Sequence, residues 1–169
     1  MMNLEKLNQL SEQEAYQQIE QACCAPNWIT GLIATRPFNS IEDLIKKSDT
    51  VWANMQESDF LAAFEGHPKI GDVNSLKEKY RNTQGEASHE QSGVNVASEK
   101  IIQQLSQSNN DYFDKFGFIF IVFATGKSAK QMLDLLLARL PNNRQQELQN
   151  GAAEQAKITN LRLQKMLED

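Results

Sequence analysis

The sequence predicts an all-α protein: a single compact bundle of roughly eight to ten short helices, in one domain that spans residues 1–169. Serines able to cap a helix N-terminus recur along the chain, each just before a stretch of good helix formers. Proline and glycine interrupt these stretches, which predicts short helices. One segment, residues 116–124, has the aromatic and β-branched composition of a strand, but the sequence offers it no partner strand.

The helices expected in the first half of the chain are defined by their caps and their breaks. Ser11 and Glu14 form a capping box at the start of one helix. The last helix of this half ends at Gly66, with Pro68 just beyond it. Helices are expected over residues 12–24, 27–34, 41–47, 50–55 and 59–65.

The second half begins with a polar stretch and ends with a long helix. Asn109 and Asn110 are expected to separate two helices, and Ser128 to cap another that stops at Pro141. The segment 116–124 is expected to be extended and threaded through the helical core. Helices are expected over residues 75–80, 98–106, 111–116, 129–140 and 143–167.

Charge and hydropathy exclude several classes of partner. The formal net charge is −5, and lysines and arginines do not cluster as they do in nucleic-acid-binding proteins. The longest apolar run, residues 116–124, is far too short to span a bilayer. The first residues lack the basic and apolar regions of a signal peptide. We therefore expect a cytoplasmic protein that binds neither nucleic acid nor a membrane.

The chain offers few ligands for a metal. Cys23 and Cys24 are adjacent, which suits neither a disulfide framework nor a structural zinc site, and we expect both to be reduced thiols. His89 and Glu90 resemble the start of a zinc-protease helix, but Gly93 stands where the second histidine is needed. A metal site is therefore not expected.

His67 is the first candidate for acid–base chemistry. It lies between Gly66, which lets the backbone turn freely, and Pro68, which restricts the conformation of the histidine. An imidazole on such a stiff corner can exchange protons near neutral pH. A histidine at a helix C-terminus that interacts only with the helix dipole explains the same pattern.

Glu90, Gln91 and Arg162 are further candidates. A carboxylate and an amide together can orient a histidine and a polar ligand, although a first-turn pair favoured by the helix dipole looks the same in sequence. Arg162 lies on or beside the apolar stripe of the last helix. It can hold a carboxylate ligand bidentately, form an internal salt bridge or extend toward solvent.

In order and spacing these residues resemble the 2-oxo-4-hydroxy-4-carboxy-5-ureidoimidazoline (OHCU) decarboxylases of urate breakdown. The resemblance covers nearly the whole chain. The segments that carry it are Leu7-Asn-Gln-Leu10, Glu14-Ala15, Cys23-Cys24, Trp28, Arg36-Pro37-Phe38, His67-Pro68-x-Ile-Gly71, Glu90-Gln91, Phe116-Gly-Phe-x-Phe-Ile121 and Leu161-Arg162-Leu163.

This resemblance implies an all-α homodimer that needs no metal or organic cofactor and converts OHCU into (S)-allantoin. It implies that His67 is the catalytic acid/base and that Glu90 is its partner. The substrate contacts that it implies are Pro68, Gln91, Arg162 and the wall formed by Phe120, Ile121, Val122, Phe123 and Ala124.

One position departs from the family pattern. The family often has serine three residues before the glutamate, where this chain has Ala87, with Ser88 one residue later. Either Ser88 takes over the substrate contact or that hydrogen bond is absent. Two other functions also fit the sequence: a non-catalytic helical module that binds a partner helix, and another cofactor-free lyase or hydrolase acting on a related ureido-imidazole ring.

Overall fold

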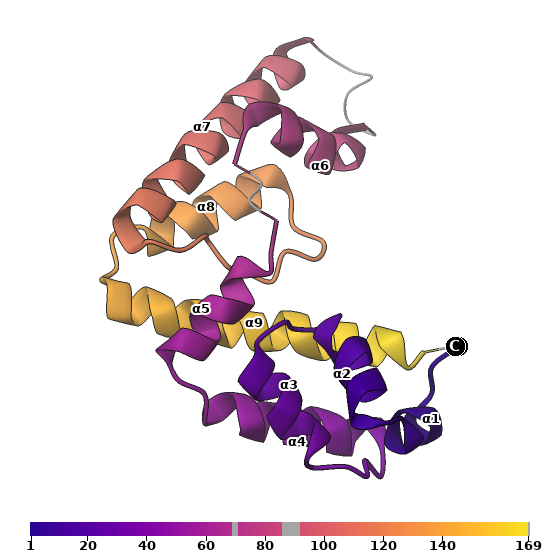
Figure 1. Ribbon diagram of the computed structural model, residues 1–169. Helices are drawn as coiled ribbons and strands as arrows, with labels where there is room; N and C mark the ends of the chain where they lie inside the picture. The colour runs from indigo at the N-terminus through magenta and orange to yellow at the C-terminus, as the bar shows by residue number, and fades with distance from the viewer. Residues whose placement is uncertain (69–70, 86–91, 169) are drawn as a thin grey trace. The chain divides into compact units, whose positions relative to one another are not determined.

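The computed structural model describes residues 1–68, 71–85 and 92–168, with side chains described for all of these except 81–85 and 92–97. Within this part of the chain the predicted all-α class is confirmed, with nine α-helices and no strand (Figure 1). The helices are α1 (Leu4–Gln9), α2 (Glu12–Glu20), α3 (Pro26–Ile33), α4 (Ile41–Ala53), α5 (Glu57–Glu65), α6 (Val73–Gly85), α7 (Ser92–Phe116), α8 (Ala129–Arg139) and α9 (Arg144–Met166).

Two predicted helix breaks are wrong, because the residues expected to break the helix bond back into it. The helices predicted at 41–47 and 50–55 are the single helix α4, in which the Thr50 hydroxyl donates to the Lys46 carbonyl at 2.9 Å. The helices predicted at 98–106 and 111–116 both lie in α7, where the Asn109 amide donates to the Leu105 carbonyl at 2.9 Å.

Most predicted helix starts are confirmed. Ser11, Ser40 and Ser128 each accept a hydrogen bond from the backbone N–H three residues later. Helix α1, whose cap is Asn3, was not predicted, and α5 begins at Glu57, two residues before the start expected at residue 59.

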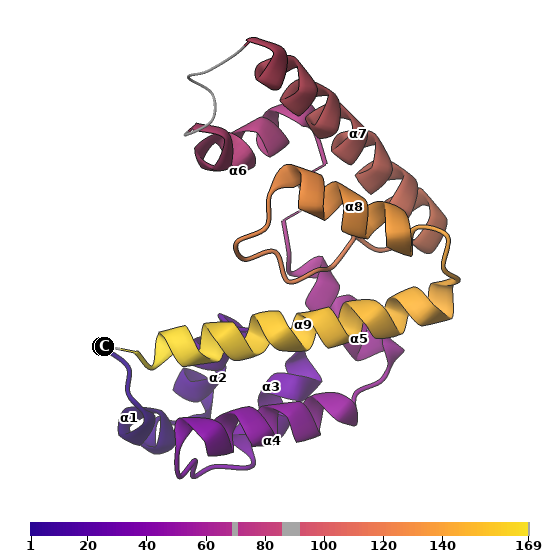
Figure 2. The same ribbon diagram turned by 180° about the vertical axis from the view of Figure 1, so that it is seen from behind.

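The chain divides into two compact units, residues 1–67 with 148–169, and residues 68–147. The first unit contains α1 to α5 and most of α9 (Figure 2). In this unit α9 is joined to α4 by a buried hydrogen bond of 2.9 Å from Trp52 Nε1 to the Ala152 carbonyl. Gly151 on α9 lies against the Phe64 ring, where a Cβ atom would come within 2.9 Å of the ring. Small residues on α9 therefore let the other helices of this unit approach closely.

The second unit contains α6, α7 and α8, and α7 packs against both of the others. Gly117 and Gly126 have φ of 80° and 76°, a conformation that favours glycine, and they bracket the connection from α7 to α8. Residues 119–124 in this connection belong to neither helix nor strand, whereas Phe116 ends α7. No helix in the described part of the chain combines the length and apolar character needed to cross a bilayer.

Candidate functional site

His67 lies just beyond the C-terminus of α5, in the first unit. Its backbone N–H donates to the Phe64 carbonyl at 3.1 Å, which extends the helical turn through the histidine. Phe64 is 1 % exposed and anchors the end of α5 in the core. The imidazole itself is half-buried, so a rigid backbone holds a ring that solvent can still reach.

Gly66 has a different role from the one predicted. Its φ of −72° and ψ of −13° are ordinary helical values, so the turn does not need the conformational freedom of glycine. A Cβ atom at this position would instead collide with the Cys24 sulfur. The residue before His67 is therefore small because Cys24 packs directly against it.

The side chain that holds His67 is Gln155 on α9, which the sequence analysis did not single out. Oε1 of Gln155 lies 2.6 Å from Nε2 of His67, and Nε2 of Gln155 donates to Oγ1 of Thr159 at 3.0 Å. Gln155, Thr159 and Arg162 are spaced i, i+4 and i+7, so they lie on one face of the helix. This spacing was the available signal, but nothing in the sequence places that face opposite His67.

Burial and charge together set the protonation of His67. Burial lowers its pKa, the positive charge of Arg162 lowers it further, and the hydrogen bond to Gln155 acts in the opposite direction. The net shift is downward, so the neutral imidazole is favoured at neutral pH. Neutral imidazole is the form that can accept a proton from a substrate.

Cys23 and Cys24 are free thiols, as predicted. Burial raises the pKa of Cys23 to about 11, so it stays protonated at neutral pH. Cys23 is also hydrogen-bonded to Thr159, and the Cys24 thiol donates to the Ala62 carbonyl at 3.4 Å. The cysteines thus form part of the packing behind His67.

Arg162 is exposed, and its guanidinium donates to the Ala22 carbonyl at 3.3 Å. Of the roles predicted for Arg162, the exposed guanidinium fits extension toward solvent from beside the apolar stripe. The guanidinium contacts a backbone carbonyl instead of a carboxylate, which disfavours an internal salt bridge. Its charge still acts on His67 in the same unit.

The predicted wall, residues 120–124, lies in the second unit. Ile121 is buried, and the other four residues are half-buried. Arg139 Nη1 donates to the Ile121 carbonyl and Lys127 Nζ donates to the Phe123 carbonyl, both at 2.6 Å. Two carbonyls of the predicted wall are therefore already engaged within the protein.

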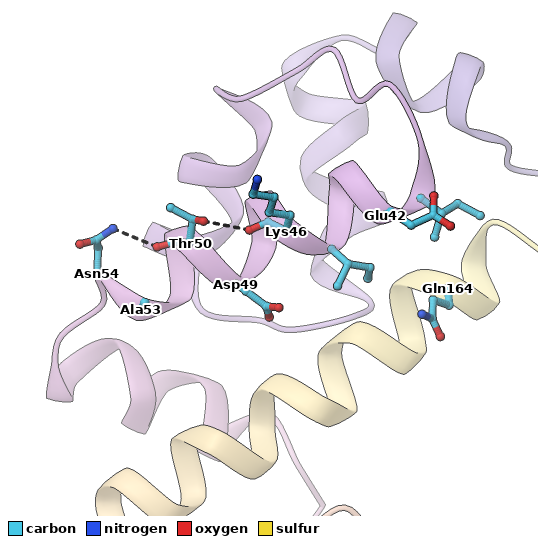
Figure 3. A pocket seen from close by; sticks show the side chains of 9 residues that line it. Glu42, Lys46, Asp49, Thr50, Ala53, Asn54 and Gln164 are labelled. Atoms are coloured by element: carbon cyan, nitrogen blue, oxygen red, sulfur yellow. Dashed lines mark hydrogen bonds between the residues drawn. The ribbon is translucent and has the colours of Figure 1, made fainter.

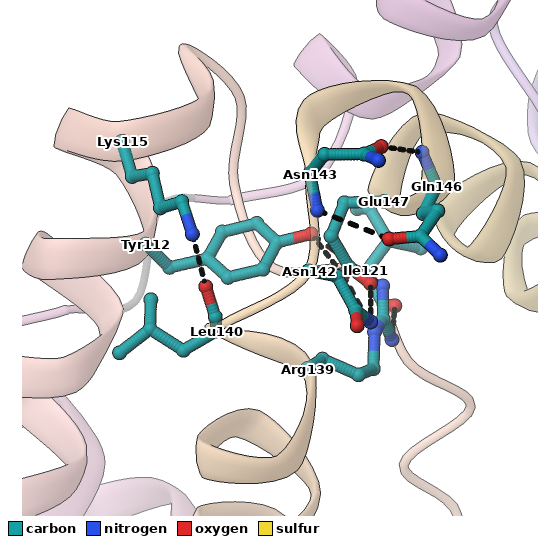
Figure 4. Close-up of polar contacts among 9 residues, drawn as sticks. All are labelled: Tyr112, Lys115, Ile121, Arg139, Leu140, Asn142, Asn143, Gln146 and Glu147. Atoms are coloured by element: carbon teal, nitrogen blue, oxygen red, sulfur yellow. Dashed lines mark hydrogen bonds and ion pairs between the residues drawn. The ribbon is translucent and has the colours of Figure 1, made fainter.

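A buried polar cluster around Glu147 braces this wall (Figure 4). One oxygen of Glu147 accepts hydrogen bonds from Tyr112 at 2.6 Å and from Arg139 at 2.7 Å, and the other accepts from Asn142 at 2.9 Å. The Arg139 guanidinium also lies 4.6 Å from the centre of the Phe120 ring. Arg139 thus joins α8, Glu147 and the segment 120–124.

Three predicted site residues, Ser88, Glu90 and Gln91, lie outside the described residues, as does Ala87. Pro68 is exposed and begins the second unit. Of the predicted site residues that the structure describes, His67 and Arg162 lie in the first unit, whereas Pro68 and residues 120–124 lie in the second. In the described part of the chain no group of three or more His, Cys, Asp or Glu side chains is arranged to hold a metal ion.

A hollow of about 650 Å³ lies elsewhere on the first unit, along α4 (Figure 3). Its lining includes Thr50 and Asn54, whose side chains donate to backbone carbonyls of α4 itself at 2.9 Å. Gln164 of α9 contributes to the lining as well. None of the predicted site residues lines this hollow.

The fold and the residues around His67 define an all-α protein with a half-buried histidine that is held by a buried amide and influenced by an arginine. The sequence profile of the OHCU decarboxylase family matches residues 8–164. The chain therefore belongs to the OHCU decarboxylase family.

Individual relatives agree with this assignment. The chain is 31% identical to the uric acid degradation bifunctional protein TTL of Arabidopsis thaliana over 88% of its own length, but it spans only 46% of that protein. It is 28% identical to the 2-oxo-4-hydroxy-4-carboxy-5-ureidoimidazoline decarboxylase of Xenopus laevis, covering 96% of this chain and 93% of that one. A crystal structure of OHCU decarboxylase in the presence of (S)-allantoin matches with a TM-score of 0.70 and 30% identity, over 89% of this chain and 96% of that one.

The chain is shorter than several of these relatives. It spans about a third of the uric acid degradation bifunctional proteins of two Bacillus strains and less than half of the Arabidopsis protein.

Proposed function

We propose that the chain catalyses the decarboxylation of OHCU to (S)-allantoin in urate breakdown, using neither a metal nor an organic cofactor. Membership of the OHCU decarboxylase family supports the substrate. The observation that carries the proposal is the half-buried, preferentially neutral His67, held by Gln155 in the same unit as Arg162. These are the groups that an acid–base decarboxylation of an anionic substrate requires.

The substrate can accept the electrons of decarboxylation within its own ring. In OHCU the carbon that bears the hydroxyl and carboxylate, C4, is bonded to C5, which forms the C=N bond of the imidazoline. As CO₂ leaves, the C4–carboxylate electron pair becomes a C4=C5 bond, and the electron pair of the C5=N bond moves to the ring nitrogen, which takes a proton from water. The 4-hydroxyl then loses its proton to become a carbonyl, and C5 gains one to give the S centre.

His67 is the acid/base in this scheme. Its neutral imidazole accepts the proton of the 4-hydroxyl and returns a proton to one face of C5. A positioned histidine contributes roughly 10²–10⁴-fold to such a step. The low pKa of His67 supports this role, because a cationic imidazole has no lone pair to accept the proton.

Arg162 binds the substrate through its exposed guanidinium. The contact that the structure shows for this group is with the Ala22 carbonyl, not with a carboxylate. Glu90 sets the charge state of His67 at the substrate. The remaining proposed contacts with the substrate come from Pro68, Ser88, Gln91 and residues 120–124. A wall built from residues 120–124 requires a rigid segment, which the hydrogen bond from Arg139 to Ile121 supports.

We also propose that residues 1–169 act as a single catalytic domain, as a homodimer, in the cytoplasm. The family match over residues 8–164 supports the single catalytic domain. The family resemblance supports the homodimer, and the compartment stays a prediction. Analytical ultracentrifugation of the purified chain tests the dimer, and a monomer across the working concentration range contradicts it.

The proposed reaction is tested by following freshly prepared OHCU by circular dichroism, with purified protein and EDTA present. We expect rapid appearance of the (S)-allantoin signal with the wild type. His67→Asn should lower turnover on the order of 10²-fold or more, because the acid/base is lost. Its thermal unfolding should stay close to that of the wild type, because the ring is only half-buried. Decay no faster than the spontaneous, racemic background contradicts the proposed function.

A further inference from the structure

A short chain of polar side chains leads from His67 into the interior of the first unit. Nε2 of His67 lies 2.6 Å from Oε1 of Gln155, and Nε2 of Gln155 lies 3.0 Å from Oγ1 of Thr159. Gln155 is 1 % exposed and Thr159 is 4 % exposed. These side chains lie behind the imidazole, where they can orient it and hold its proton.

The groups in this chain determine the direction of each hydrogen bond. The amide nitrogen of Gln155 donates to the Thr159 hydroxyl, so the amide oxygen faces His67. An amide oxygen accepts hydrogen bonds and cannot donate them, so Nε2 of His67 must carry the proton. A neutral imidazole has one N–H, and Nδ1 is therefore left with the lone pair.

Thr159 extends this chain toward Cys23. A hydrogen bond between Thr159 and Cys23 partly opposes the rise in the pKa of the thiol that burial causes. The Thr159 oxygen has two lone pairs, so it can accept the N–H of Gln155 at 3.0 Å whichever way its own proton points. The opposite orientation of the amide would instead present its oxygen to Thr159 and place the proton of His67 on Nδ1.

We propose that Gln155 is a positioning residue that keeps the proton of neutral His67 on Nε2, so that Nδ1 is the atom that exchanges a proton with the substrate. This inference rests on the proposed decarboxylation. Nδ1 takes the proton of the 4-hydroxyl as the O–H electron pair becomes the second C4–O bond. The C4=C5 electron pair then forms the new C5–H bond with the proton that Nδ1 returns.

The tautomer is tested by NMR of protein with ¹⁵N-labelled histidine, without substrate. The chain has two histidines, so comparison with His67→Asn assigns the signals of His67. We expect a protonated, pyrrole-type Nε2 and an unprotonated, pyridine-type Nδ1 in the wild type. Gln155→Leu should give a mixture of tautomers, whereas Gln155→Glu should keep Nε2 protonated, because a carboxylate also accepts its proton.

Two further variants separate this role from general damage to α9. Thr159→Val removes the group that fixes the amide, so it should also shift the tautomer ratio, and it gives the answer if Gln155→Leu does not fold. Asn160→Ala is the matched control, because Asn160 lies beside Thr159 but donates to Asp49 at 2.9 Å. Asn160→Ala should leave the tautomer of His67 unchanged.

Kinetics test the consequence for catalysis. Gln155→Leu should lower kcat on the order of tenfold and leave KM within about twofold, since Gln155 lies behind His67 and does not touch the substrate. Gln155→Glu should recover most of kcat at neutral pH or above. An Nδ1–H tautomer in the wild type overturns the proposal, as does an altered tautomer with unchanged kcat. If the wild type does not decarboxylate OHCU, the proposed function fails while the tautomer result still stands.

Discussion

Two polar clusters in the described part of the chain, one around Glu147 and one around His67, differ in how completely their polar groups are paired. In the second unit Glu147 is fully buried and accepts hydrogen bonds from Tyr112, Arg139 and Asn142 on both of its oxygens. In the first unit, His67 is half-buried and bonds to Gln155 through one nitrogen. Within the described residues the other nitrogen, Nδ1, faces no hydrogen-bond partner.

This difference separates a cluster that stabilises the protein from one that is available for chemistry. The carboxylate of Glu147 and the guanidinium of Arg139 neutralise one another, and the remaining bonds satisfy their other polar atoms. Proton exchange at Glu147 would break that arrangement. The neighbourhood of His67 instead combines a preferentially neutral base with the exposed guanidinium of Arg162.

The largest expected effect is on stability, at Glu147. Glu147→Gln removes the charge that compensates the largely buried Arg139 and should lower the free energy of unfolding by about 3–5 kcal/mol. Urea denaturation followed by circular dichroism measures this change. Lys130→Ala is the matched control, because the ion pair of Lys130 with Asp134 is exposed and should contribute about 0–1 kcal/mol. Equal losses in the two variants would contradict the distinction between the clusters.

A smaller loss is expected at Gly66, where the packing behind His67 is tight. Gly66→Ala places a Cβ atom against the Cys24 sulfur and should cost about 1–3 kcal/mol through overpacking. Cys24→Ala should relieve the collision, so the double variant should be more stable than the sum of the single changes predicts. Additive free energies of unfolding would show that the two residues do not constrain one another.

How far the sequence predicts the fold depends on whether the signal is local. Serine caps are local, and Ser11, Ser40 and Ser128 begin helices where expected. The predicted breaks within α4 and α7 failed because polar residues such as Thr50 and Asn109 can bond to the preceding turn as readily as they can cap a helix. Sequence alone does not distinguish these two uses.

The candidate site shows the same limit over longer distances. His67 stood out because its neighbours, glycine and proline, restrict the local backbone. Gln155 is 88 positions away, and nothing in the sequence distinguishes it from the other glutamines of its helix. Only the fold brings its Oε1 to 2.6 Å from Nε2 of His67. Arg139 of α8 and Glu147 of α9 were missed for a related reason, since charged residues on helices are usually solvated and only the fold buries this pair.

A third prediction tests whether Arg162, in the cluster around His67, binds the substrate. Lysine keeps the charge but cannot form the paired hydrogen bonds of a guanidinium, so Arg162→Lys should raise KM on the order of tenfold, or about 1.4 kcal/mol. The free energy of unfolding should barely change, because the side chain is exposed. Initial rates across a range of OHCU concentrations measure KM, and an unaltered KM rules out the anchoring role.

The smallest expected effect is the pH dependence that His67 contributes. Burial, with a further contribution from Arg162, holds the pKa of His67 below its usual value of about 6.5. As the pH falls, kcat/KM should therefore stay constant past the usual histidine range and decline only when this lowered pKa is reached. The free energy of unfolding should depend on pH in the same direction as kcat/KM. The contribution of His67 to it is fully present above the pKa of His67 in the unfolded chain and is lost as the pH falls through the lower pKa of His67 in the folded protein.

NMR titration of His67 and the pH profile of kcat/KM should give the same pKa if His67 is the base. Arg162→Gln should move that pKa upward in the titration, because the opposing positive charge is gone, while the buried environment keeps part of the shift. Glu147→Gln should leave the pKa of His67 where it is, because Glu147 belongs to the other cluster. A pKa at or above the usual histidine value would contradict the role of His67 as a neutral base. The cluster around His67 would then not differ from the cluster around Glu147 in its availability for proton transfer.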